Sequence, residues 1–118
     1  MTYAAANNPL WIIRDGALEE YPSDKQPVGV SVIGVKQFTQ RTVPLKKGDR
    51  IYTFTDGYAD QFGGPKGKKF KSKQLQKIFL ENHELPMVEQ KKILEDLLES
   101  WKGNLVQVDD ILIIGVRI

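Results

Sequence analysis

The stretch that decides the fold is residues 48–64, which read GDRIYTFTDGYADQFGG. From Arg50 to Thr55 the side chains have the alternating character of a β-strand that is at least half buried. The acidic Asp56 follows directly, and Gly57 lets the chain turn sharply after it because glycine has no Cβ. This stretch therefore predicts a strand that carries a carboxylate to the end of a sheet.

A second acidic pair, Asp109 and Asp110, stands directly before the nearly continuous apolar run 111–116, which suits a strand covered on both faces. If this strand is the antiparallel neighbour of 50–55, Asp56 and Asp109 lie at the same edge of the sheet. Converging carboxylates repel one another unless a cation neutralises them, and Mg²⁺ and Mn²⁺ prefer such oxygen ligands. The alternative is an ordinary Asp-Gly turn and a solvated acidic loop.

The first half of the chain is expected to form strands and turns. Segments 10–14 and 17–21 flank Asp15-Gly16, a pair suited to the two-residue type I′ turn of a hairpin, because both turn residues need a positive φ. Residues 29–33 and 37–43 are rich in β-branched side chains and predict two more strands.

The second half is expected to be mainly helical. Ser72 is a candidate N-cap for a short helix, and a longer one starts near Pro86 and carries an apolar stripe to Trp101. Gly103 follows as the expected C-terminal stop. Together with the strands this order predicts an α+β fold with antiparallel sheets and two helices on one face.

Composition narrows the possible chemistry. The 118 residues make one domain, and a net charge of +2 is too small to indicate nucleic acid as a partner, so none is expected. The lack of cysteine excludes disulfides, thiolate metal sites and thiol nucleophiles, and a single histidine excludes His-rich metal sites. No run is apolar and long enough to span a membrane, and residues 1–6 lack the basic start of a signal peptide, so we expect no membrane contact and a cytoplasmic location.

The run 48–64 resembles the core motif of SpoIIE-like metal-dependent serine/threonine phosphatases, relatives of the protein phosphatase 2C (PP2C) group. Three further segments are similar to family motifs and follow in the family's order: 5–10 with 14–16 (Ala-Gly-His-Asn-Pro and its hairpin, with Asn7 in place of His), 26–29 (Pro-Leu-Gly), and 106–112 (Asp-Asp-x-Thr, with Leu112 in place of Thr). The resemblance extends over essentially the whole chain.

This resemblance implies a layered α-β-β-α sandwich with a binuclear Mn²⁺ or Mg²⁺ site at one end. Carried over by position, Asp56 and Asp109 are the expected catalytic metal ligands, and Asp60 is expected beside them or on a more loosely held ion. Asp110 is expected to orient Asp109 or to cap a turn, and Gly57 to leave room for the turn.

The implied reaction is hydrolysis of phosphoserine or phosphothreonine on a regulatory protein in bacterial signalling. In this chemistry the metal pair lowers the pKa of a bridging water, which attacks phosphorus in line. No phosphoenzyme is needed, so the lack of cysteine is no obstacle.

The sequence departs from the family in one large respect. The family's upstream Asp-x-Thr-Gly-His-Gly-like motif, which supplies further metal ligands, has no counterpart here. We therefore interpret residues 1–118 as the C-terminal portion of a phosphatase domain and expect the chain alone to be inactive. Apolar surfaces left uncovered predict a homo-oligomer. The alternatives are a non-catalytic interaction or dimerisation module derived from this fold, and an unrelated small α+β domain.

A lysine-rich segment follows the core motif. Gly63 and Gly67 are too close together for a phosphate-binding Walker loop. Lys66, Lys68 and Lys69 are candidates for a rim that attracts a phosphorylated substrate, and the alternative is a solvated loop.

Overall fold

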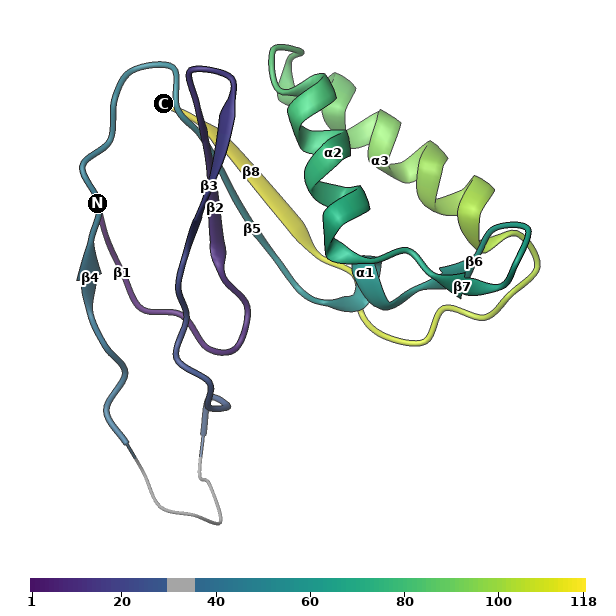
Figure 1. Cartoon of the computed structure of the whole chain (residues 1–118), viewed down its shortest axis with the longest axis horizontal. Coiled ribbons are helices and arrows are strands. Elements are labelled where there is room, and N and C mark those ends of the chain that lie inside the picture. The colour runs from purple at the N-terminus through teal and green to yellow at the C-terminus, as the bar shows by residue number, and fades with distance from the viewer. Residues whose placement is uncertain (30–35) are drawn as a thin grey trace.

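The computed structural model describes residues 1–29 and 36–118. The elements in chain order are β1 (Thr2–Tyr3), β2 (Leu10–Arg14), β3 (Ala17–Tyr21), β4 (Arg41–Thr42), β5 (Arg50–Phe54), α1 (Gly57–Asp60), β6 (Phe62–Gly63), β7 (Lys68–Lys69), α2 (Ser72–Asn82), α3 (Met87–Lys102) and β8 (Ile113–Arg117). Figure 1 shows three layers: the β1–β4 ribbon, a central sheet, and helices α2 and α3. None of the described helices is long and apolar enough to cross a membrane.

The central sheet has the strand order β3-β2-β5-β8, and every neighbouring pair in it is antiparallel. The β2–β3 hairpin confirms the expected turn, because Asp15 and Gly16 both have positive φ values, of 51° and 75°. The expectation of an α+β fold with antiparallel sheets is confirmed, and a third, short helix, α1, adds to the two expected ones.

One face of the sheet packs against α2 and α3. Trp11 of β2 and Tyr52 of β5 are almost fully buried there, together with Leu75 and Phe79 of α2. The rings of Tyr52 and Phe79 stack with centroids 4.2 Å apart, which joins the middle of the sheet to the helix layer. This aromatic core fixes how the helices lie on the sheet.

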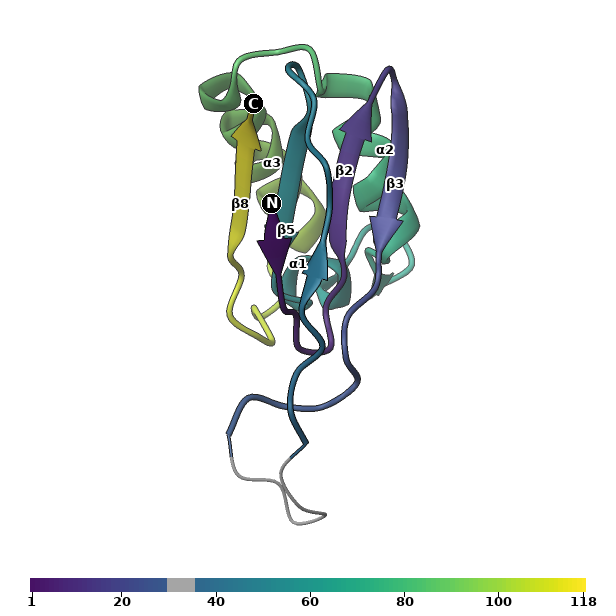
Figure 2. The same ribbon diagram turned by 90° about the vertical axis from the view of Figure 1, so that its left-hand side faces the viewer.

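The opposite face of β2 and β5 is covered by the β1–β4 ribbon, as Figure 2 shows. Leu10, Ile12 and Ile51 project to this side and form a second buried cluster with Val43, which directly follows β4. The sheet is therefore buried on both faces at β2 and β5, its two middle strands.

Two predicted strands have different outcomes. Most of the strand expected at 29–33 lies outside the described residues. The strand expected over 37–43 is wrong except at β4. The reason is that this segment bonds to Asp24 instead: the Asp24 carboxylate accepts hydrogen bonds from the backbone N–H of Thr39 (2.6 Å) and from the Arg41 guanidinium (3.1 Å). The bond to the Asp24 side chain here takes the place of strand-to-strand hydrogen bonds.

The helix boundaries are largely as expected. Helix α3 follows Pro86 and ends at Gly103, whose φ of +53° suits glycine. The expected N-cap role of Ser72 is wrong: Lys71 occupies that position with a φ of 77°, held by a bond from its N–H to Ala59 O (2.8 Å). The short elements α1, β6 and β7 were not anticipated by the sequence pattern.

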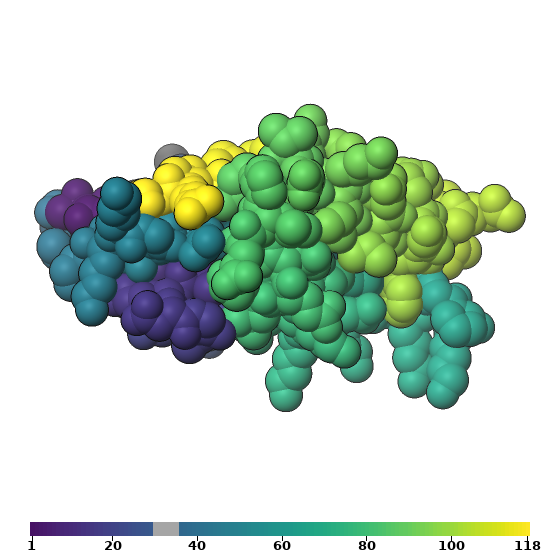
Figure 3. Space-filling view, turned by 90° about the horizontal axis from the view of Figure 1, so that it is seen from above, coloured from purple at the N-terminus to yellow at the C-terminus, as the bar shows by residue number. Residues whose placement is uncertain are grey.

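The last strand also differs from expectation. The apolar run predicts a strand covered on both faces, but β8 is an edge strand whose residues Ile114 and Val116 are about half exposed. Figure 3 shows the yellow atoms of this C-terminal strand at the molecular surface. The run is apolar enough for a central strand, yet no described strand lies beyond it.

An ion pair between the partly exposed Arg14 and the buried Asp49 closes the end of the sheet opposite Asp56. The Arg14 guanidinium donates two hydrogen bonds to Asp49, at 3.0 and 2.7 Å, and the N–H of Lys46 donates a third at 2.8 Å. The bonds from Arg14 hold the pKa of Asp49 below its ordinary value, although desolvation opposes this shift. The pair ties the end of β2 to the start of β5.

We predict that Asp49→Asn lowers the free energy of unfolding at neutral pH by about 2 kcal/mol, because Arg14 loses its buried charged partner. The pKa of Asp49 is lower in the folded than in the unfolded state. Its contribution to the free energy of unfolding is therefore complete above the unfolded pKa of about 3.9 and is lost as the pH falls through the lower folded pKa. Urea titrations between pH 7 and pH 2.5 should therefore show a smaller acid-induced loss in Asp49→Asn than in the wild type. Asp96→Asn, on exposed α3 surface, is the control, and an equal acid response in all three proteins would contradict this role.

Candidate metal centre at the ends of β5 and β8

The backbone brings the two acidic segments together at one end of strands β5 and β8. Strands β5 and β8 pair in register from Arg50 with Arg117 to Phe54 with Ile113, so the expected antiparallel pairing is confirmed. The ladder continues one step further through a bond from Thr55 N–H to Leu112 O (2.9 Å). Asp56, which follows the end of β5, and Asp110, which precedes the start of β8, therefore lie at the same end of this strand pair.

The hydroxyl of Thr55 fastens the two segments together. It donates a hydrogen bond to Asp110 O (2.9 Å) and accepts one from Leu112 N–H (3.0 Å). A hydroxyl is able to do both at once, so this one side chain satisfies two backbone groups beyond the end of the ladder. The role of Thr55 was missed in the sequence, where it reads only as the last residue of an alternating strand.

Gly57 is required by close packing. A Cβ atom on this residue would overlap the carbonyl oxygen and carbon of Asp110. The start of α1 therefore rests directly on the backbone of the second acidic segment. The room that Gly57 was expected to leave is used by the Asp110 peptide group.

The loop that carries Asp109 is anchored at a second point. Gln61 is fully buried and donates hydrogen bonds from Nε2 to Val106 O and Phe62 O, both at 3.0 Å. Its backbone carbonyl oxygen accepts a hydrogen bond from the Trp101 indole (2.9 Å). Nothing in the sequence pattern distinguishes Gln61 from an exposed glutamine. Its contacts help to hold the exposed segment 103–110 against the body of the protein.

The candidate carboxylates are solvent-accessible. Asp56 is exposed and immediately precedes α1, and its side chain makes no capping hydrogen bond. Asp60 lies one helical turn later, and its N–H donates to Asp56 O (2.9 Å). Asp109 accepts a hydrogen bond from the N–H of Asp110 at 2.7 Å, which turns one carboxylate oxygen toward its own backbone. The structure thus places Asp56 and Asp60 on the same helical turn after β5, and Asp109 in the segment that leads into the neighbouring strand β8.

The lysine segment forms a hairpin beside α1. Lys68 and Lys69 make up β7, which pairs with β6, while Lys66 lies exposed in the connecting turn. The ammonium of Lys69 lies 3.6 Å from a carboxylate oxygen of Asp60 in a surface ion pair. One residue of the expected rim therefore contacts one of the expected metal-site carboxylates.

The donor set fits Mg²⁺ or Mn²⁺ in kind but falls short in number. Carboxylate and carbonyl oxygens are the ligands these hard ions prefer. Among residues 1–29 and 36–118, however, no three His, Cys, Asp or Glu side chains are grouped closely enough to hold a metal ion. The described residues supply part of a binuclear site at most.

Comparison with known proteins decides the family. The family model described as stage II sporulation protein E (SpoIIE) matches residues 1–118. The chain belongs to the SpoIIE family. A search of curated proteins gave no significant match.

Solved structures agree with this assignment. The SiaA-PP2C domain of Pseudomonas aeruginosa is similar with a TM-score of 0.86 and 29% identity over 99% of this chain. The phosphatase domain of the cell fate determinant SpoIIE from Bacillus subtilis shares the fold, with a TM-score of 0.55 and 19% identity over 95% of this chain. This SpoIIE-family chain spans 46% and 48%, respectively, of those two chains.

We predict that Gly57→Ala destabilises the protein by about 2–3 kcal/mol, because the added methyl group forces the Asp110 backbone away from α1. Gly115→Ala adds the same group 3.0 Å from Met87 Sδ and 3.1 Å from the Tyr52 ring, which is tight contact with side chains but no overlap with backbone, and should cost less. Thermal unfolding of the two variants tests this contrast. Equal losses, or a larger loss in Gly115→Ala, would contradict the packing role of Gly57.

Proposed function

We propose that this chain contributes the Asp56 and Asp109 side of a metal-dependent protein serine/threonine phosphatase site. The observation that carries the proposal is the β5–β8 register, extended by Thr55 and Gly57 onto the Asp110 backbone. Membership of the SpoIIE family and the likeness to two phosphatase domains support it independently. The assignment of individual residues follows from these two lines together.

In the proposed site Asp56 and Asp109 would hold Mn²⁺ or Mg²⁺, and Asp60 would act beside them or on a more loosely held ion. Asp110 and Gly57 position Asp109 by keeping the two strand ends in contact. The bound ions would supply an activated water for attack on phosphorus. The exposed Lys66 and Lys68 would attract the phosphorylated substrate, while Lys69 balances the charge of Asp60.

The proposed substrate is a phosphorylated regulatory protein in bacterial signalling, and the proposed location is the cytoplasm. We further propose that residues 1–118 correspond to the C-terminal portion of the phosphatase domain. The coverage of less than half of each related chain supports this view. The remaining metal ligands would then come from the part of the domain that has no counterpart here.

A second candidate function is a non-catalytic interaction or dimerisation module that retains the phosphatase fold. The observation that favours it is the shortage of metal-ligating side chains in the described part of the chain. On either interpretation we propose that the chain by itself forms a homo-oligomer, because large apolar side chains of β8 stay exposed.

We predict that the chain alone, supplied with millimolar Mn²⁺, releases phosphate from a generic aryl phosphate no faster than the buffer does. The reason is that residues 1–29 and 36–118 offer too few metal-ligating side chains to hold the ions that would activate a water. A colorimetric phosphate assay checks this result. Turnover comparable to that of an intact phosphatase domain would contradict the proposed division of the site.

We predict weak Mn²⁺ binding that depends on Asp56. Isothermal titration of the wild type should show binding heat, and Asp56→Asn should weaken it at least tenfold because one charged oxygen ligand is lost. Asp96→Asn, which changes another exposed carboxylate on α3, is the control and should bind like the wild type. Unchanged heat in Asp56→Asn would favour the non-catalytic module.

A further inference from the structure

The ammonium of Lys69 is held beside the candidate metal centre by two contacts. It lies 3.6 Å from a carboxylate oxygen of Asp60, and the two side chains are 51% and 40% exposed. It also lies over the ring of Phe62, 5.8 Å from the ring centroid, which is within the range of cation–π attraction. Phe62 is the cross-strand neighbour of Lys69 in the β6–β7 ladder, so the strand pairing itself brings the ring and the ammonium together.

The β6–β7 hairpin is fastened to α1 by backbone hydrogen bonds. Directly after β7, the N–H of Phe70 donates to Gln61 O (3.0 Å) and the N–H of Lys71 donates to Ala59 O (2.8 Å). The two acceptors are the sequence neighbours of Asp60 on either side. The strand that carries the ammonium is therefore tied to the backbone that carries the carboxylate.

Aromatic packing under the hairpin fixes it further. Phe70 is 4% exposed, and its ring meets Tyr58 and Trp101 edge-on, with centroids 5.2 and 5.3 Å apart. After β6, the N–H of Gly64 donates to Trp101 O (2.9 Å), and a Cβ atom on Gly63 would overlap that same carbonyl group. The hairpin therefore rests directly on the end of α3.

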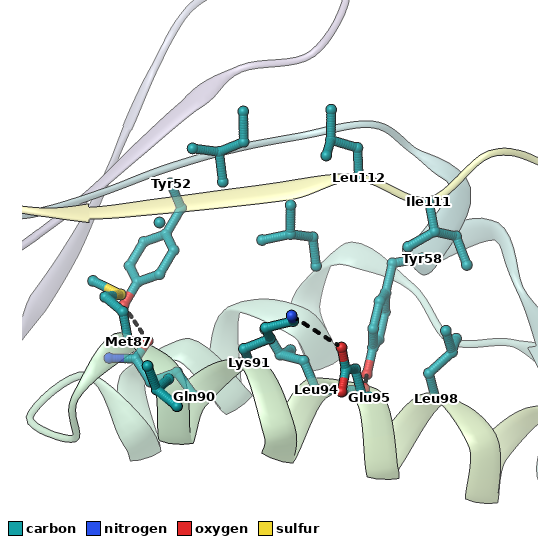
Figure 4. Close-up of a pocket in the computed structure, with 14 residues that line it drawn as sticks. Tyr52, Tyr58, Met87, Gln90, Lys91, Leu94, Glu95, Leu98, Ile111 and Leu112 are labelled. Carbon is teal, nitrogen blue, oxygen red and sulfur yellow. Dashed lines mark hydrogen bonds and ion pairs between the residues drawn. The ribbon is translucent and has the colours of Figure 1, made fainter.

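Helix α1 is anchored to α3 as well. Tyr58 reaches from α1 to α3 along one wall of the cavity shown in Figure 4, and its hydroxyl donates a hydrogen bond to Leu94 O (2.7 Å). Burial raises the pKa of Tyr58 to about 12, so the hydroxyl keeps its proton at neutral pH and remains a donor. Because α1 and the hairpin both rest on α3, the fold sets the separation between Asp60 and Lys69.

We propose that Lys69 is a built-in competitor for metal at Asp60. In the metal-free protein the Lys69 ammonium pairs with this carboxylate, and a divalent ion that binds Asp60 displaces it. An ion on the same carboxylate would lie beside the ammonium, and like charges repel, so the two cations exclude each other. An exposed ion pair contributes little to stability, so the competition lowers the affinity for the ion without blocking its binding.

This inference rests on the proposed function, because it takes Asp60 to be a metal-site carboxylate. It adds a link between metal and substrate. The ammonium that the ion displaces stays on the fixed hairpin, where it can pair with the phosphoryl group of a substrate. Binding of the ion thus converts Lys69 from a partner of Asp60 into part of the proposed lysine rim.

Lys68 provides the matched comparison. It precedes Lys69 on β7 and is also exposed, and successive side chains of a strand point to opposite faces. Among residues 1–29 and 36–118, Lys68 takes part in no ion pair. Lys68→Met and Lys69→Met change the net charge equally. A general electrostatic effect on metal binding would therefore be the same in both, whereas competition for Asp60 acts only through Lys69.

The experiment is a titration of the chain with Mg²⁺, which is diamagnetic, followed by NMR at the carboxyl carbons of aspartate and the ζ-nitrogens of lysine. We expect the Asp60 and Lys69 signals to shift with one common midpoint while the Lys68 signal stays in place. In Lys69→Met the Mg²⁺ midpoint at Asp60 should fall about threefold, and Lys68→Met should leave it near the wild-type value. Roughly 0.5 M KCl should remove this difference, because salt screens exposed charges.

A shift of Asp60 without a shift of Lys69 would overturn the proposal. So would equal midpoints in the wild type and Lys69→Met, or equal decreases in Lys68→Met and Lys69→Met. Mg²⁺ shifts at Asp56 and Asp109 but not at Asp60 would reject the role of Lys69 and leave the proposed metal centre in place. No shift at any of the three carboxylates would reject both.

Discussion

The structure depends on the antiparallel pairing of β5 with β8. These strands are separated by α1, the β6–β7 hairpin and both long helices, yet their pairing determines which side chains meet at each end of the sheet. At one end the Thr55 hydroxyl and Gly57 hold the backbone of Asp110. At the other, Ile118 bonds to Asp49, whose carboxylate holds Arg14. A slip by one residue would reverse the faces of β8 and separate these contacts.

The sequence predicted those turns and helix ends that depend only on the conformations of neighbouring residues. The Asp15-Gly16 hairpin and the stop at Gly103 both follow from backbone conformations that few residues adopt, so the sequence alone was sufficient. The strand over 37–43 failed because Asp24, distant in the sequence, bonds to its backbone. The Arg14–Asp49 pair was not predictable, because many carboxylates are available and only the fold selects one.

The sequence predicted which strand ends carry the candidate carboxylates, but not the hydrogen bonds that hold the surrounding backbone in place. The spacing of the strands anticipated that Asp56 and Asp109 would approach one edge, and the confirmed pairing of β5 with β8 is the arrangement that this requires. The supporting contacts of Thr55 and Gln61 were missed, because a polar residue gives no sign in the sequence of the backbone group it will bond. The edge position of β8 was also missed, since apolar composition describes what a strand can bury and not what covers it.

The most direct test of the central claim is a crystal structure of the chain soaked in Mn²⁺, with anomalous scattering recorded to locate the ion. We expect an anomalous peak in contact with oxygens of both Asp56 and Asp109, beyond the last bond between Thr55 and Leu112. Two ions about 4 Å apart, with ligand bonds of about 2 Å, bridge carboxylates no more than about 8 Å apart. Ordered carboxylates beyond that separation, with manganese bound elsewhere or not at all, would contradict the account.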